Sequence, residues 1–90
     1  MAIAPTVASQ IVLNCINAQG VVGTPDPGKS PSDYGIGQNG GLCNCIKSKL
    51  NAIGYDIDFG KCLAMSLSSP INIWIDFVAQ NSNQIIKANP

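Results

Sequence analysis

The four cysteines, Cys15, Cys43, Cys45 and Cys62, constrain this chain more than any other feature. A domain of ninety residues buries only a marginal amount of apolar surface and commonly needs cross-links. An even number of cysteines in so small a chain is typical of two disulfides. The spacing also differs from the C-x2-C or C-x4-C pairs of structural zinc sites. We therefore expect two disulfides and no bound metal; four buried free thiols are the alternative.

Disulfides indicate an extracellular or otherwise oxidising compartment. Residues 1–25 carry no charged side chain, so they lack the basic segment of a signal peptide. A secreted protein with this sequence would therefore be in its mature form. Polar residues interrupt the apolar stretch from Ile3 to Val22, which argues against a transmembrane segment.

The charged residues exclude several classes of function. They make up 11% of the chain, against about 25% in a typical domain. All five positive residues are lysines, all five negative ones are aspartates, and histidine, arginine and glutamate are absent. Nucleophile–histidine catalysis and bidentate arginine contacts to phosphate or guanine are thus excluded. We therefore expect a non-catalytic protein that has no cofactor. Because the net charge is zero, we also expect that it binds no nucleic acid.

Apolar residues recur at intervals of three and four, which is the helical period. This pattern predicts four helices, over residues 5–18, 42–53, 59–67 and 70–88. Between the first two, residues 19–41 hold seven of the nine glycines and three of the six prolines. We predict an all-α fold: a single helical domain over residues 1–90, a small disulfide-stapled bundle of about four helices with one long Gly/Pro-rich loop at 19–41.

Cys43 and Cys45 lie on the helix predicted over residues 42–53. Its apolar stripe consists of Leu42, Ile46, Leu50 and Ile53. The two cysteines fall on either side of this stripe, about 160° apart, and cannot easily bond each other. Each can instead reach a neighbouring helix, where Cys15 and Cys62 lie. The predicted helix is therefore central and stapled on both flanks, with the choice of pairing open.

The segment from Cys43 to Asn51, with its Cys-Asn-Cys sequence, resembles the C-x-C helix of the plant lipid-transfer and hydrophobic-seed-protein group. The resemblance covers about ten residues. Members of that group carry eight cysteines with an adjacent pair, and this chain has four and no adjacent pair, so the disulfide connectivity of the group does not transfer. The resemblance implies a helical bundle around an apolar tunnel, whereas the residues alone favour a solid core.

Residues 23–30 match the G-x-x-x-x-G-K-[ST] phosphate-binding pattern. Pro25 and Pro27 lack the amide hydrogens that such a loop directs at phosphate. Pro31 follows at once, where a phosphate-binding loop would continue into a helix. We therefore predict a proline-rich turn without a nucleotide.

Asp56 and Asp58 are two carboxylates separated by one residue, a pattern compatible with acid–base chemistry or calcium binding. No third acidic residue is near them in the sequence. We expect Asp58 to cap the helix that follows it and Asp56 to lie in a turn.

The last predicted helix has two apolar faces. Its main stripe, which we expect to face the core, contains Ile71, Trp74, Ile75, Val78, Ile85 and Ile86. Ile73 and Phe77 lie off this stripe, and we predict that they form a binding surface. Tyr34 and Ile36 are expected to anchor the long loop and to contribute to the same surface.

The function predicted from these residues is non-catalytic. We expect a small secreted protein that acts through apolar binding of a protein partner, through self-association, or through binding of a small lipid-like ligand. The alternative is a structural subunit of an assembly, such as a virion or an extracellular fibre.

Overall fold

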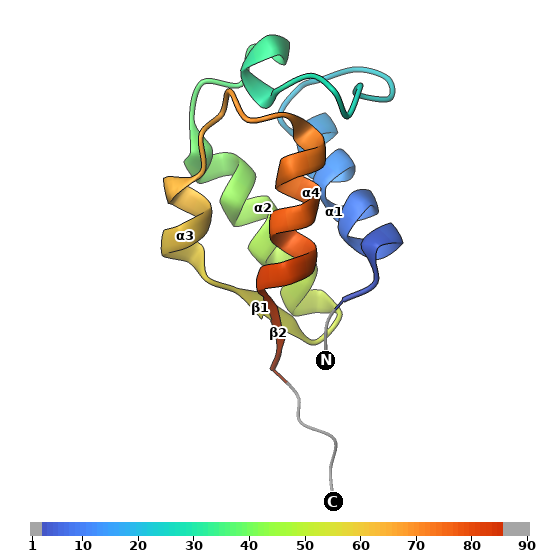
Figure 1. Ribbon diagram of the computed structural model, residues 1–90, viewed down its shortest axis with the longest axis vertical. Helices are drawn as coiled ribbons and strands as arrows, with labels where there is room; N and C mark the ends of the chain where they lie inside the picture. The colour runs from blue at the N-terminus through green and yellow to red at the C-terminus, as the bar shows by residue number, and fades with distance from the viewer. Residues whose placement is uncertain (1–2, 86–90) are drawn as a thin grey trace, which may run out of the picture.

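The helix α2 (Asn39–Ala52) is the central element of the protein, and every other helix is connected to it directly or through α1. The computed structural model describes residues 3–85. The other helices are α1 (Pro5–Ala18), α3 (Phe59–Ala64) and α4 (Ile71–Asn81), with a 3-10 turn η1 (Pro31–Tyr34) and two short strands, β1 (Tyr55–Ile57) and β2 (Ser82–Gln84). The predicted small, mainly helical fold with about four helices is confirmed (Figure 1).

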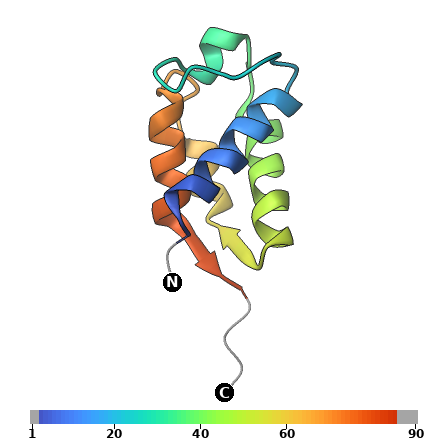
Figure 2. The same ribbon diagram turned by 90° about the vertical axis from the view of Figure 1, so that its right-hand side faces the viewer.

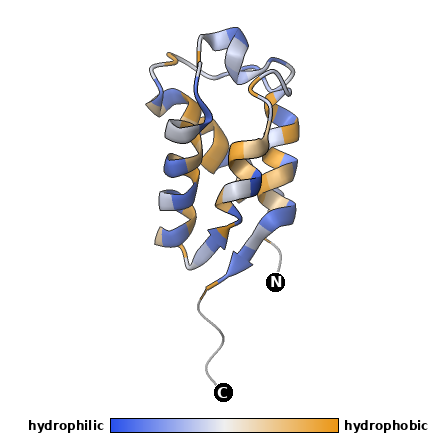
Figure 3. Cartoon of the chain, turned by 90° about the vertical axis from the view of Figure 1, so that its left-hand side faces the viewer, coloured by the Kyte–Doolittle hydropathy of each residue, from blue (hydrophilic) through white to orange (hydrophobic). Residues whose placement is uncertain are grey.

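The helix α1 packs against both α4 and α2, and α3 packs against α2. In Figure 2, α1 runs diagonally from the lower end of α4 toward the upper end of α2. The two strands pair antiparallel below the helices, with Tyr55 opposite Gln84 and Ile57 opposite Ser82. Hydrophobic residues concentrate between the helices, while α2 presents polar residues outward (Figure 3).

Two disulfides connect α2 to its neighbours. Cys15 of α1 pairs with Cys45, and Cys43 pairs with Cys62 of α3. The Cα atoms are 5.6 Å and 5.9 Å apart, within the range usual for disulfides. The prediction that the two cysteines of α2 serve different neighbours is confirmed, and the structure gives the pairing.

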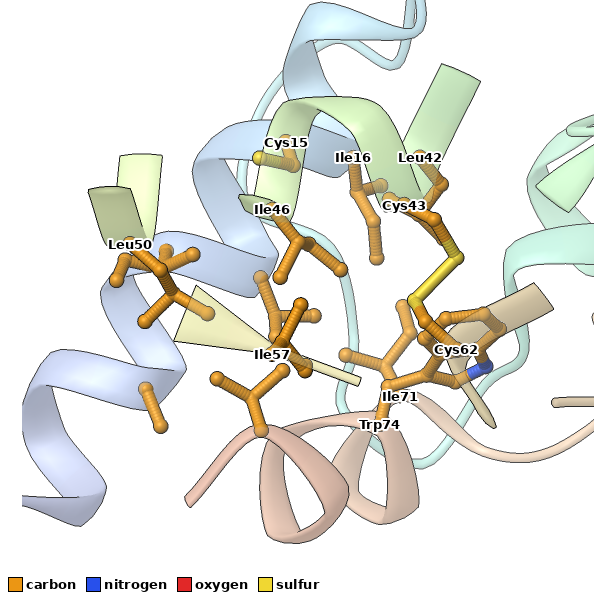
Figure 4. Packing of buried hydrophobic residues seen from close by; sticks show 14 of the residues in the cluster. Cys15, Ile16, Leu42, Cys43, Ile46, Leu50, Ile57, Cys62, Ile71 and Trp74 are labelled. Carbon is orange, nitrogen blue, oxygen red and sulfur yellow. A yellow bond between two sulfur atoms is a disulfide. The ribbon is translucent and has the colours of Figure 1, made fainter. Parts of the chain in front are cut away.

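Residues from all four helices form one buried cluster (Figure 4). Three of the four residues in the predicted α2 stripe are fully buried, namely Leu42, Ile46 and Leu50. Trp74 of α4 is the largest fully buried side chain. In Figure 4, Trp74 lies in the same part of the core as the Cys43–Cys62 bond.

The last helix is shorter than the sequence predicts, because it ends at Asn81 rather than near residue 88. The Asn81 side-chain amide donates a hydrogen bond to the Phe77 carbonyl oxygen at 2.9 Å, and the Ser82 hydroxyl donates to the Val78 carbonyl oxygen. Short polar side chains that bond nearby backbone groups favour helix ends. The chain then forms β2. Ile85 is half exposed, which corrects its placement in the core stripe, and Ile86 lies outside the described residues.

The helix α2 begins at Asn39, three residues earlier than predicted. The Asn39 side-chain amide donates hydrogen bonds to the carbonyl oxygens of Leu63 and Met65. It thereby satisfies backbone groups at the end of α3, which ends at Ala64 rather than at residue 67. The Gly/Pro-rich stretch is therefore shorter than predicted, and η1 interrupts it.

The segment that matches the phosphate-binding pattern caps α4. The carbonyl oxygens of Pro27 and Lys29 accept hydrogen bonds from the amides of Asn72 (2.9 Å) and Ile71 (2.7 Å). The amides of Gly28 and Lys29 both donate to Asp26, at 2.8 Å and 3.0 Å. The segment thus presents carbonyl oxygens to a helix start and uses these amides within the chain.

These contacts also correct the predicted start of α4. The Ser69-Pro70 sequence predicts a serine N-cap followed by proline in the first turn. The observed N-cap residue is Pro70, and no side chain caps this end. Backbone carbonyls from residues 27 and 29 replace the expected serine hydroxyl.

Candidate functional site

A cleft of about 390 Å³ opens at the surface between α1 and the C-terminal half of α2. We refer to it as the α1–α2 cleft. Four of the side chains that line it are aliphatic: Val7, Ile11, Ala52 and Ile53. The other three are Thr6, Gln10 and Lys49. Its walls are therefore mainly apolar, with hydrogen-bond donors on both helices.

The Cys15–Cys45 disulfide determines where the cleft lies. Ile11 and Val7 precede Cys15 by four and eight residues, and Lys49 and Ile53 follow Cys45 by the same intervals. Because a helix has 3.6 residues per turn, these positions lie about one and two turns away from the disulfide on each helix. Since α1 leads toward α4 at its N-terminal end (Figure 2), the two helices separate with distance from the cross-link.

Exposure of the lining side chains follows this geometry. Ile11, one turn from the disulfide, is buried, whereas Val7 and Ile53, two turns away, are 38% and 49% exposed. The sequence placed Ile53 in the core as the fourth member of the α2 stripe, and this prediction is wrong. The described chain covers the apolar stripe of α2 as far as Leu50, and Ile53, at the end of the stripe, remains exposed.

Two lysines on α2 have different electrostatic surroundings. The Nζ atom of Lys47 lies 3.0 Å from Oδ1 of Asp56 on β1. Within residues 3–85 this is the only ion pair, so Lys49 lines the cleft without a carboxylate partner from that part of the chain. No acidic residue is among those that line the cleft.

Asp56 was predicted to lie in a turn, but it belongs to the strand β1. Hydrogen bonds from Lys47, and secondly from the Ile57 amide, hold the pKa of Asp56 below its ordinary value. The neighbouring carboxylate follows the prediction: Asp58 caps α3 by accepting a hydrogen bond from the Lys61 amide at 3.1 Å.

The four residues predicted to form a binding surface differ in their exposure, and none of them lines the α1–α2 cleft. Ile73 is 47% exposed on α4, whereas Phe77 is partly buried against the core. Ile36 is buried, and Tyr34 is partly buried with its hydroxyl accepting a hydrogen bond from the Asp26 amide at 2.7 Å. Tyr34 and Ile36 therefore anchor the loop as expected, and the role of the set in binding stays a prediction.

Sequence reasoning did not find the cleft, although its positions have a regular spacing. The sequence pattern predicts that Ile53, two turns from Cys45, faces the core with the rest of its stripe. The angle between α1 and α2 cannot be derived from the sequence. This angle decides whether Val7 and Ile53, two turns from the disulfide, are covered.

Two further clefts are more polar. One, of about 430 Å³, lies between α1 and residues 24–25, and the other, of about 270 Å³, lies beside residues 35–38. In the first, the Asn17 side-chain amide is already bonded to the carbonyl oxygens of Val21 and Gly23. Of the three clefts, the α1–α2 cleft has the most apolar lining.

Among residues 3–85 there is no group of three or more side chains able to hold a metal ion. No helix in the same range has the length and apolar character needed to cross a bilayer. Comparisons with protein-family models, with curated proteins and with solved structures found no match.

Proposed function

We propose that this chain is a small, secreted, non-catalytic protein that binds one apolar ligand in the α1–α2 cleft. The observation that carries the proposal is the pair of half-exposed aliphatic side chains, Val7 and Ile53, on the two walls of a cleft whose inner part holds the buried Ile11. A volume of about 390 Å³ falls in the range typical of small-molecule sites.

The energetics favour an apolar ligand. Covering exposed apolar surface yields about 25 cal/mol for each Å² removed from water. The walls are cross-linked by the Cys15–Cys45 disulfide, so little conformational freedom is lost on binding and more of this free energy contributes to affinity. Secretion is supported by the two disulfides, which are usual in small extracellular domains.

A non-catalytic role is supported by how the acidic groups are used. Asp33 lies in a capping box with Ser30, Asp56 pairs with Lys47, and Asp58 caps α3. None of these carboxylates lines the cleft, and the sequence contains no histidine to act as a base.

The test is a titration of the isotope-labelled protein with dodecanol, an uncharged single-chain probe, followed by methyl NMR. We expect shifts concentrated at Val7, Ile11 and Ile53. The variant Ile53→Ser should weaken binding, and the matched control Leu63→Ser, which alters a side chain 43% exposed on α3, should not. Shifts centred on α3 or α4, or equal losses in the two variants, would contradict the proposed site.

A second candidate is a structural subunit of an assembly, and exposed aliphatic residues away from the cleft support it. Val22 in the long loop is 95% exposed, and Leu63 and Ile73 are close to half exposed on α3 and α4. Side chains of this kind on several faces suit packing among copies. Native mass spectrometry tests this candidate, since an assembly subunit should not be monomeric at micromolar concentration.

A further inference from the structure

We infer that the ligand of the α1–α2 cleft is a single-chain amphiphile with a carboxylate head, held by the ammonium group of Lys49. This inference rests on the proposed function and adds the chemical class of the ligand. The aliphatic side chains receive the hydrocarbon chain, and the polar side chains at the cleft receive the head.

Charge complementarity supports a carboxylate head. Lys49 brings one positive charge to a cleft that no acidic residue lines. Lys47 shows what a lysine of α2 does when a carboxylate is within reach: its ammonium group is 3.0 Å from Asp56. Lys49 has no such partner among residues 3–85, so an anionic ligand would supply the missing half of the pair.

The polar side chains on the opposite wall of the cleft also support an anionic head. Thr6 and Gln10 belong to α1, one helical turn apart, and line the same cleft as Lys49. The Thr6 hydroxyl and the Gln10 amide can donate hydrogen bonds to a carboxylate. Donors on both walls and no competing carboxylate favour an anionic head over a cationic one.

The small size of the apolar lining favours a small ligand. A stable protein partner buries about 800 Å² on each side, and the continuous apolar part of this cleft consists of four side chains. A small amphiphile is therefore favoured over a second copy of the protein or a peptide.

Lys49 also lies in the last turn of α2, where a positive charge stabilises the helix end. The test must therefore separate a contact with the ligand from a purely structural effect. Three probes share one alkyl chain and differ in the head: dodecanoate, methyl dodecanoate and dodecanol. Each is titrated below its aggregation concentration, at neutral pH and low salt, into the oxidised protein and monitored by methyl NMR.

We expect dodecanoate to bind about tenfold more tightly than the two uncharged probes, the factor that corresponds to about 1.4 kcal/mol. Lys49→Gln should abolish this preference, so that the three probes bind the variant about equally, and should leave the circular dichroism spectrum unchanged. Lys47→Gln is the matched control, because it removes an equal charge from the same helix at a position that does not line the cleft; it should retain most of the preference. Added salt should reduce the preference in the wild type.

The outcomes distinguish failure of the carboxylate inference from failure of the proposed function. Equal binding of the three probes, or a preference that survives in Lys49→Gln, would overturn the carboxylate inference and leave the apolar site in place. Failure of all three probes to bind would overturn the proposed function together with the inference.

Discussion

The two flanks of α2 carry the same pattern of residues but have different surroundings in the folded protein. On one flank, Cys43 is followed four residues later by Lys47, and on the other, Cys45 is followed four residues later by Lys49. The first cysteine bonds α3 and the first lysine pairs with β1, so this flank is closed. The second cysteine bonds α1, and the second lysine lines an open cleft.

The elements available to cover each flank explain the difference. The chain leaves α2 through β1 and α3, which pack back against it, and β2 joins β1 at the end of α4. On the other flank α1 meets α2 at the disulfide and then leads toward α4 (Figure 2). A repeated residue pattern on one helix therefore gives a core on one side and a candidate site on the other.

Removal of each disulfide in turn should have the largest effects and tests the comparison most directly. The loops they close span 30 residues for Cys15–Cys45 and 19 for Cys43–Cys62, and chain entropy alone gives each about 3–4 kcal/mol, slightly more for the longer loop. Burial predicts the opposite order. Cys43 and Cys62 are both fully buried, whereas in the other pair Cys15 is fully buried and Cys45 only partly. Removing Cys43–Cys62 therefore leaves one more buried serine hydroxyl without a partner, at a cost of about 1–3 kcal/mol.

We therefore expect Cys43→Ser/Cys62→Ser to lower the free energy of unfolding more than Cys15→Ser/Cys45→Ser does, as measured by urea titration. The second variant should instead weaken dodecanol binding in the cleft. A larger stability loss in Cys15→Ser/Cys45→Ser would show that loop length outweighs burial and that the flanks do not differ in this way.

Truncation of one large apolar residue on each flank should have the next largest effect. Trp74→Ala removes a fully buried ring from the closed side and should cost about 3–5 kcal/mol, as aromatic truncations in cores do. Ile53→Ala, at the open cleft, should cost less than about 1 kcal/mol. Thermal unfolding of both variants measures the difference, and a similar loss in the two would indicate that the cleft is closed in solution.

The outer face of α4 shows how far the closed side extends. Phe77 is partly buried and Ile73 is half exposed, so Phe77→Ser should cost about 1–3 kcal/mol and Ile73→Ser less than about 1 kcal/mol. If Ile73 belongs to a contact surface, its variant should also reduce self-association in sedimentation experiments. Equal stability losses would argue that both side chains pack against the same core.

How much the sequence could predict depends on the range of the interactions involved. The first helix, at residues 5–18, was predicted with its observed bounds, because a proline at its start and a glycine after its end are local signals. The opposed directions of Cys43 and Cys45 also follow from local helical geometry. Which cysteine bonds which neighbour depends on how three helices pack, and the residues left that open.

The predictions that failed involve contacts between distant segments. Residues 82–84 continue a helical pattern in the sequence and instead pair with β1. Asn39 begins α2 where it can bond the end of α3, and residues 27 and 29 cap α4. The cleft is of the same kind, because it depends on the angle between α1 and α2. Local periodicity carries no information about any of these.

The smallest expected effect concerns the Lys47–Asp56 pair, which marks the closed flank electrostatically. The pKa of Asp56 in the folded protein is lowered from its ordinary value of 3.8 by the Lys47 ammonium group and the Ile57 amide. A lowered pKa stabilises the folded state above pH 3.8, and this contribution is lost as the pH falls through the lower folded value. Both side chains are partly exposed, and pairs of this kind typically contribute less than about 1 kcal/mol.

We therefore expect Asp56→Asn to be slightly less stable than the wild type at neutral pH, and the difference to shrink as the pH falls below 3.8. Asp33, whose pKa is also lowered by the Ser30 amide and hydroxyl, titrates in both proteins and cancels in the comparison. Urea unfolding at several pH values measures the difference, and added salt should reduce it at neutral pH. A difference that is constant from neutral to acidic pH would mean that the folded state does not favour the ionised form of Asp56. Dodecanoate binding should be unchanged in this variant, since Asp56 lies on β1 and does not line the cleft where Lys49 is placed.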